Sequence, residues 1–293
     1  ASIMPAEEWN NITVEDINKG IVVVDHAITY DNGQASGTVP DFNEFVWVSI
    51  PESNKFARTA WTTKYGYDAD GNWNSSGTLT TPHQLSEVST SYRWWEDKTT
   101  TEYTNMVASV QEYKGFYIGR YEASKDSTGT IAQSKHNQEA WTFVAQTEAI
   151  TASTQLNPTN NSHLMYGIEW DSVLNWLNGN ATISSTTTGE TKTMELDDIQ
   201  TNSSSWGNYP KSTGNAATDA GSKQNTGYSE YWKANNIYDL AGNVFEWTQE
   251  KYSTGTNIVG RGGDYFDNGD DNPVAYRYYN DETNATLDVR FSF

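Results

Sequence analysis

The last 33 residues of the chain, 261–293, hold the side chains best suited to chemistry, and that chemistry is recognition. The segment contains six Asp, four Asn and four Tyr. Tyr offers a large amphipathic contact area, Asn and Asp offer short hydrogen-bonding groups, and antibody binding loops use similar residue types. No long apolar run in the segment demands burial. We therefore expect a ligand-binding surface, with Tyr265, Phe266, Tyr276 and Tyr278 at least partly exposed on one face.

Groups suited to catalysis are scarce in the sequence. The chain has no Cys, which excludes disulfides, thiolate metal sites and cysteine nucleophiles. Its four His residues lie far apart, and no two have the spacing of metal ligands: His26, His83, His136 and His163. A phosphate-binding loop, a dinucleotide fingerprint and a Gly-x-Ser-x-Gly elbow are also missing. The composition therefore favours binding over catalysis.

Two stretches carry a family resemblance. Residues 235–248 read NNIYDLAGNVFEWT, and residues 260–263 read GRGG. Together they resemble the signature of the formylglycine-generating-enzyme (sulfatase-modifying factor) family, and FYIGRYEAS at 116–124 is a weaker match. The resemblance extends over 115–293. It implies an α+β protein with a C-type-lectin-like fold of the formylglycine-generating-enzyme subtype, with long loop insertions.

The sequence departs from this family at the positions of the oxidase cysteine pair. Counted without gaps, these positions fall on Asp267 and Asn272, which cannot act as thiolate copper ligands or form a mixed disulfide. A second enzymatic relative holds iron through three His, and the scattered His residues here do not match it. We therefore expect no enzymatic activity. An alternative is that the protein is an enzyme of the same superfamily with different chemistry.

The resemblance also implies a calcium site. In the family, two side chains and two main-chain carbonyls hold the ion, and the matching residues are Asp239, Gly242, Val244 and Glu246. Carboxylates at 239 and 246 suit a hard, oxygen-seeking cation. The other interpretation is that these carboxylates only cap turns and pair with a nearby Arg. Calcium is the one cofactor implied, and no organic cofactor is expected.

The C-terminal segment is framed by RGG at 261–263 and VRF at 289–291. This frame resembles the residues that flank the varied segment in variable proteins from diversity-generating retroelements. Those proteins are ligand binders of phage tails and bacterial surfaces. The residues that fit the varied positions of such proteins are Asp264, Tyr265, Phe266, Asp267, Asn268, Asp271, Tyr276, Tyr278 and Asn280. The other interpretation is an ordinary Asn/Asp/Tyr-rich loop in a fixed lectin-like protein.

Apolar periodicity predicts the strands that must position these groups. Residues 21–24 and 45–50 are typical of buried strands, and 115–124 alternates like a half-buried strand. Apolar residues with helical spacing predict a helix over 103–113, which Gly115 can end.

Two core helices are expected after these strands. The first falls within 137–149. The second has an inward stripe that is stopped by Asn178-Gly179 and consists of Trp170, Val173, Leu174 and Leu177. Trp170 and Trp247 are predicted to be core residues.

Residues 180–230 are rich in Ser, Thr, Asn and Gly, which predicts long surface loops braced by Trp206 and Tyr209. We expect a single domain over 1–293. It would comprise a strand- and loop-rich portion at 1–114 and the C-type-lectin-like core at 115–293, with the ligand-binding segment at 261–293.

The net charge of −20 disfavours nucleic acid and anionic membrane surfaces as partners. No apolar run is long enough to span a membrane, and no signal-peptide pattern is present. The leading prediction is a non-enzymatic protein, extracellular on a bacterial cell surface or a virion such as a phage tail, that binds a protein or glycan receptor. The runner-up is a calcium-dependent carbohydrate-binding lectin.

Overall fold

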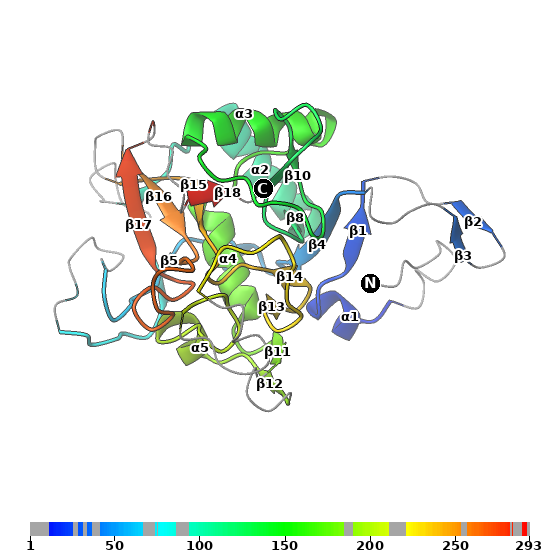
Figure 1. Ribbon diagram of the computed structural model, residues 1–293. Helices are drawn as coiled ribbons and strands as arrows, with labels where there is room; N and C mark the ends of the chain where they lie inside the picture. Colours follow the sequence, from blue (N-terminus) through cyan, green and yellow to red (C-terminus); the bar gives the residue numbers. More distant parts are fainter. Residues whose placement is uncertain are drawn as a thin grey trace.

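The computed structural model describes residues 12–25, 29–31, 34–36, 42–66, 74, 76–85, 94–184, 190–210, 221–252, 257–281, 283 and 289–291. Within these residues, mostly antiparallel sheets and five helices form a mixed α/β fold (Figure 1). The expected mixture of helices and strands is confirmed at this level. In the same residues, no helix has the length and apolar character needed to cross a membrane.

The first sheet has the order β1–β4–β8 and is antiparallel, with β1 at Val22–Val24, β4 at Glu44–Ser49 and β8 at Gly115–Gly119. Alternation along β4 places Val46 and Val48 in the core with no exposed surface. Strands β1 and β4 confirm the predictions at 21–24 and 45–50, whereas the strand predicted over 115–124 ends at Gly119.

The second sheet contains the C-terminal segment. Its order is β17–β16–β15–β18, with β15 at Phe245–Tyr252, β16 at Asn257–Arg261, β17 at Arg277–Asp281 and β18 at Val289–Phe291. Strand β18 runs parallel to β15, and β7 (Trp94–Trp95) pairs with the far end of β15. Part of the segment predicted to bind ligand is therefore a structural strand.

Helices α2 (Thr101–Tyr113) and α4 (Gly167–Leu177) follow the predicted periodicity. The four predicted stripe residues of α4 have no exposed surface. Helix α2 ends at Tyr113 and is capped by Lys114, which takes the left-handed conformation with φ 64°. The predicted Gly115 cap is therefore wrong, and Gly115 opens β8 instead.

The prediction of a helix within 137–149 is largely wrong. Residues 137–145 form a loop, and helix α3 runs over Gln146–Leu156. The loop is held by two buried side chains, Trp141 and Val144, and by the bond that Trp247 Nε1 donates to the Val144 carbonyl at 2.9 Å. In the sequence, these two apolar residues have the spacing of one helical turn, which is why a helix was predicted.

The region 180–230 is more ordered than predicted. It contains a hairpin of β11 (Thr182–Ser184) with β12 (Thr191–Thr193), and helix α5 (Leu196–Gln200). The loop prediction is therefore wrong for these elements. Trp206 and Tyr209 are wholly buried, which confirms their bracing role.

Short elements complete the described part of the chain. Helix α1 is Val14–Asn18, and single turns of 3-10 helix are Ser53–Lys55 and Pro158–Asn160. The remaining hairpins pair β2 (Thr29–Asp31) with β3 (Gln34–Ser36), β5 (Thr59–Ala60) with β6 (His83–Gln84), β9 (Ser124–Lys125) with β10 (Ala132–Gln133), and β13 (Lys233–Ala234) with β14 (Ile237–Tyr238).

In the part of the chain that the structure describes, the core consists of two apolar clusters. The larger surrounds α4 and includes Trp170, and the smaller includes Trp247 and lies between β15 and α3. Both tryptophans have no exposed surface, which confirms their prediction as core residues.

Candidate functional site

Strands β16 and β17 hold the two ends of a long loop. Their last paired residues are Arg261 and Arg277, which lie opposite each other in the antiparallel ladder. Residues 262–276 connect them, and we call this connection the recognition loop. The pairing fixes where the loop leaves and re-enters the sheet.

A buried ionic cluster fixes the same two arginines through their side chains. Asp171 Oδ1 accepts from Arg261 Nη2 at 3.1 Å and from Arg277 Nη2 at 3.2 Å. Glu250 accepts from Arg261 Nη1 at 3.1 Å and from Arg277 Nε at 3.0 Å. Among the described residues, Arg261 Nε and Arg277 Nη1 are buried without a hydrogen-bond partner, so the network is satisfied only in part.

Arg58 and Glu96 complete this ionic cluster. Arg58 bonds to Asp171 at 3.1 Å and to Glu250, and its Nη1 lies 3.6 Å from a carboxylate oxygen of Glu96. The side chains of all six members are at most 9% exposed. Three arginines and three carboxylates thus stand together out of water, with formal charges that cancel.

Burial and charge shift the pKa values of this cluster. Burial raises the pKa of Glu96 to about 7, aided by the charge of Glu250 and opposed by Arg58. Burial and the neighbouring Arg277 lower the pKa of Arg261 to about 10. Burial alone would raise the pKa of Glu250, but Arg58, Arg277 and Arg261 hold it below its usual range.

The start of the recognition loop is folded inward. Asp264 is buried, and its Oδ1 accepts from the backbone N–H groups of Phe266 at 2.8 Å and Asp267 at 2.9 Å. Tyr265 is only 7% exposed, and its N–H donates to the Asn243 carbonyl at 3.2 Å. The expectation that Tyr265 is exposed is therefore wrong, because its backbone is tied to the turn before β15.

The recognition loop is also tied to residues that follow α5. The Ser203 N–H donates to the Gly269 carbonyl at 3.0 Å, and Ser203 Oγ accepts from the Val274 N–H at 3.0 Å. Tyr209 donates its hydroxyl to the Gly262 carbonyl at 2.9 Å. The loop backbone is therefore anchored at several points along its length.

The middle of the recognition loop faces solvent. Phe266 is 60% exposed, although its ring packs against Tyr265 with centroids 4.3 Å apart. Asp267 is exposed, and Asn268, Asp270 and Asp271 are half-buried. An apolar ring beside short polar side chains has the composition of a recognition surface.

The loop at 62–66 adjoins this surface, which the sequence did not indicate. The pKa of Lys64 is raised, first by its hydrogen bond to Tyr65 and further by the charges of Asp270 and Asp271. Tyr65 is 43% exposed, and Lys64 Nζ lies 4.7 Å from its ring centroid. A Cβ atom on Gly66 would lie 2.5 Å from the Tyr276 ring, so residues 62–66 lie beside the end of the recognition loop.

The other predicted binding residues lie closer to the core. Tyr276 and Tyr278 are half-buried and pack against Phe245, with the Tyr278 ring stacked at 5.0 Å between centroids. Asn280 is half-buried and donates to the Tyr278 hydroxyl at 3.2 Å. Partial exposure of Tyr276 and Tyr278 is confirmed, but both rings also help to close the smaller core cluster.

The turn at 239–246, which the resemblance marks as a calcium site, is wholly buried. Asp239, Gly242 and Asn243 all adopt positive φ angles, and the Asp239 carboxylate accepts from the Gly227 N–H at 2.6 Å. This bond supports the interpretation that Asp239 caps a turn. Asn243 links three segments, because it donates to Glu122 at 2.9 Å and accepts from Asn208 at 2.9 Å.

Glu246 lies at the other end of this turn, with its carboxylate against Gly262. A Cβ atom on Gly262 would collide with Glu246 Oε2 and would lie 2.9 Å from the Leu240 carbonyl oxygen. Hard oxygen donors therefore converge here. Among the described residues, no group of three His, Asp or Glu side chains could hold a metal ion. Calcium at this turn would thus need main-chain carbonyls together with Asp239 and Glu246.

One histidine stands out from the scattered set. His163 Nε2 lies 3.1 Å from both oxygens of Glu169, and Nδ1 lies 2.8 Å from the Asn161 carbonyl. Burial alone would lower the pKa of His163, but the attraction of Glu169 and these hydrogen bonds raise it to about 9. His163 is therefore a charged structural partner of Glu169 at neutral pH.

The chain was compared with protein-family models, curated proteins and solved structures. No family model and no curated protein matches the chain. In solved structures, the chain is similar to "Treponema denticola variable protein 1", with a TM-score of 0.48 and 13% sequence identity, over 93% of this chain and 98% of that chain. The function proposed below rests on the geometry of the described residues.

Proposed function

We propose that this protein is a non-enzymatic binding protein with a C-type-lectin-like fold, and that the recognition loop carries its ligand surface. The observation that carries the proposal is the closure of this loop by Arg261 and Arg277, which are paired in the sheet and bound to the same two buried carboxylates. A loop whose ends and backbone are fixed pays little conformational entropy on binding.

The side chains that would contact the ligand are the outward ones. Phe266 would be the apolar anchor, with Asp267, Asn268 and Asp271 as polar contacts and Tyr65 as a second ring. Exposed aromatic residues at the centre of an interface commonly dominate its binding energy. Asp264 and Tyr265 would support the loop from inside, while Tyr276, Tyr278 and Asn280 would form its edge.

The receptor of this surface would be a protein or a glycan, and the protein would stand on a bacterial surface or a phage tail. The acidic composition supports a role away from nucleic acid and anionic lipid. Display of this kind would suit a loop whose outward residues can be exchanged while the anchoring residues stay.

The neighbouring DNA tests whether the surface is diversified. We expect a reverse-transcriptase gene close by, with a near-copy of the segment that encodes 261–291. Adenines of that near-copy should fall at codons of the outward residues, such as Phe266 and Asp267. A near-copy that concentrates its adenines at the codons of Arg261, Asp264 and Arg277 would contradict the proposal.

A second candidate, the calcium-dependent lectin, is favoured by the buried carboxylate of Glu246 beside the Leu240 carbonyl. A glycan array with and without a calcium chelator separates the two. Binding that is abolished by the chelator and restored by calcium supports the lectin. Glycan binding that survives the chelator and is lost in Phe266→Ser supports the recognition loop.

A further inference from the structure

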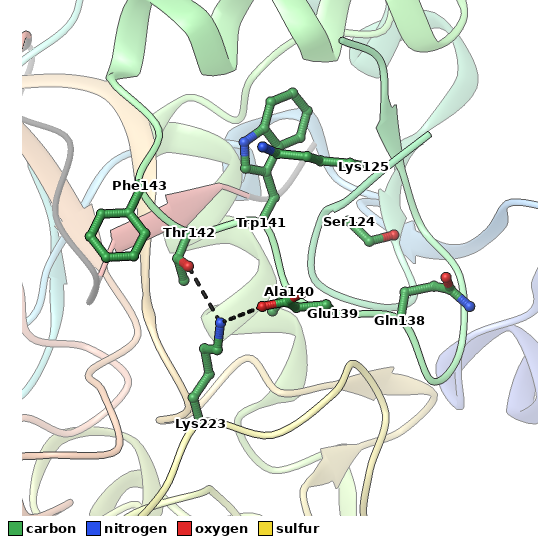
Figure 2. A pocket seen from close by; sticks show the side chains of 9 residues that line it. All are labelled: Ser124, Lys125, Gln138, Glu139, Ala140, Trp141, Thr142, Phe143 and Lys223. Carbon is green, nitrogen blue, oxygen red and sulfur yellow. Dashed lines mark hydrogen bonds and ion pairs between the residues drawn. The ribbon is translucent and has the colours of Figure 1, made fainter. Parts of the chain in front are cut away.

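A second concave site lies on a different part of the molecule. It has a volume of about 400 Å³ and is bordered by Lys125 of β9, by residues 138–143 before α3, and by Lys223 from a distant segment (Figure 2). The volume falls within the range of small-ligand sites. No residue of the recognition loop lines this pocket.

Two lysines at this pocket give it a local charge opposite to that of the chain. The charged residues lining it are Lys125, Lys223 and Glu139, in a protein with a net charge of −20. Cations that gather at one concave place in an acidic protein focus a positive potential there. The pocket therefore favours a negatively charged ligand.

The amine of Lys223 is held at the mouth by weak partners. Its Nζ lies 3.1 Å from Glu139 Oε1 and 3.4 Å from Thr142 Oγ1, as the dashed lines of Figure 2 show. The Glu139 side chain is 82% exposed, so this ion pair is solvated and contributes little to folding. A carboxylate on a ligand can replace Glu139 as the partner of Lys223 at small cost.

Lys125 lies over an aromatic wall. Its Nζ is 4.9 Å from the centroid of the Trp141 ring, which is buried. This contact orients the ammonium group without using its donors, because the attraction comes from the ring face. Lys125 thus keeps hydrogen-bonding capacity at the pocket.

Phe143 is placed at the rim at some cost to folding. It is 61% exposed, and its φ of 57° lies in the left-handed region, which bulky residues rarely occupy. Glycine or asparagine would suit this backbone, and a polar side chain would suit this exposure. A residue that is unfavourable on both counts points to a function for the ring.

We propose that this pocket binds the carboxylate of an acidic sugar, such as a uronic acid unit of a glycan. Lys223 would bind the carboxylate in place of Glu139, and Lys125 would add to the positive potential of the pocket. The Phe143 ring would pack against the apolar C–H face of the sugar. Thr142 and Gln138, which also line the pocket, would bind sugar hydroxyls. This inference is independent of the recognition loop and of calcium.

The test compares two sugars that differ only in the acid group. Binding of methyl β-D-glucuronide and methyl β-D-glucoside to the full chain is measured by NMR titration in the presence of a chelator. We expect the glucuronide to bind at least about tenfold more tightly, which corresponds to about 1.4 kcal/mol, and to weaken as salt rises. Equal binding of the two sugars, or none by either, would overturn the proposal.

Variants then locate the site. Lys223→Gln should lower glucuronide affinity about tenfold, whereas Lys55→Gln, which removes the same charge from an exposed position outside the pocket, should not. Phe143→Asn should lower affinity while keeping or raising the melting temperature, because Asn tolerates the left-handed backbone. Wild-type affinity in both Lys223→Gln and Phe143→Asn contradicts the site.

Two further controls separate neighbouring explanations. Phe266→Ser should leave glucuronide binding unchanged, so failure of the recognition loop as a receptor surface is distinguishable from failure of this pocket. N-acetylaspartate methylamide presents a carboxylate without a sugar. If it binds as tightly as the glucuronide, the pocket recognises acidic peptides and the saccharide assignment is wrong.

Discussion

Arg261 and Arg277 lie opposite each other across β16 and β17, and both donate to Asp171 Oδ1, at 3.1 and 3.2 Å. Two like charges stand side by side here because buried carboxylates lie between them. The arrangement ties the ends of the recognition loop to helix α4 and strand β15 at once.

Removing one arginine should therefore destabilise the fold. Arg277→Met leaves Asp171 and Glu250 with one fewer cation in a buried place, and breaking such a pair typically costs about 3–5 kcal/mol. Equilibrium denaturation in urea measures this loss. Lys19→Gln, at an exposed ion pair with Glu15, is the control and should leave the midpoint close to wild type. A midpoint unchanged in Arg277→Met would show that the ionic cluster contributes nothing net to stability.

Truncation of two neighbouring rings should affect the stability of the fold differently. Tyr265→Ala removes a buried ring and should cost about 3 kcal/mol of unfolding free energy. Phe266→Ser removes an exposed ring and should leave the melting temperature nearly unchanged. Calorimetry on the pair tests the division of the loop into an inward and an outward part. Similar losses in both variants would contradict it.

Stability should fall as pH rises through the titration of His163. Its folded pKa of about 9 lies above the ordinary value of 6.5, so its contribution is complete below pH 6.5 and is lost as pH rises through 9. The free energy of unfolding, measured at several pH values, should decline over this window in the wild type. His163→Gln should flatten that decline, and an unchanged slope would show that the Glu169 contact does not hold a charged ring.

Titration of Glu96 should also make the free energy of unfolding depend on pH, in a lower pH range than that of His163. Its folded pKa of about 7 lies above the ordinary value of 4.5, so the folded state binds the extra proton more tightly. Stability from this group is complete below pH 4.5 and is lost as pH rises through 7. Glu96→Gln keeps the shape of the protonated acid and should flatten the curve between pH 4.5 and 7. The same slope in wild type and Glu96→Gln would contradict this assignment.

Calcium should raise the melting temperature if it binds at the 239–246 turn. Calcium at 100 times its dissociation constant would stabilise the folded state by about 2.7 kcal/mol. Glu246→Gln should abolish this rise, whereas Asp267→Asn, at an exposed carboxylate, should keep it. A wild-type melting curve that is the same in calcium and in chelator would remove the calcium site from this protein.

Periodic patterns in the sequence predicted the helices and strands that bury one face. The stripe of α4 and the alternation of β4 were found because burial repeats with the period of the element. The helix expected within 137–149 failed because Trp141 and Val144 are buried from a loop, and two buried residues three apart cannot be told from a helical turn. Helix α5 escaped notice because its polar surroundings concealed Ile199, which is wholly buried.

The candidate site was predictable in composition but not in geometry. The Asp, Asn and Tyr content of the C-terminal segment indicated a recognition surface, and Phe266 is exposed as expected. The backbone of Tyr265 is bonded to the distant Asn243, a contact that no local pattern reveals. The ionic cluster was also missed, although Asp171, next to Trp170 of the predicted inward stripe, was a usable signal, since a buried charge needs a partner.

The ionic cluster is formally neutral, which bears on the repulsion between copies of this protein. Its three arginines and three carboxylates cancel, so the net charge of −20 belongs to the rest of the chain. Copies of the protein must then repel one another over a distance set by the ionic strength, about 10 Å at 0.1 M salt. Where many copies are arrayed side by side, this repulsion adds to the size of the fold in setting how densely they can stand.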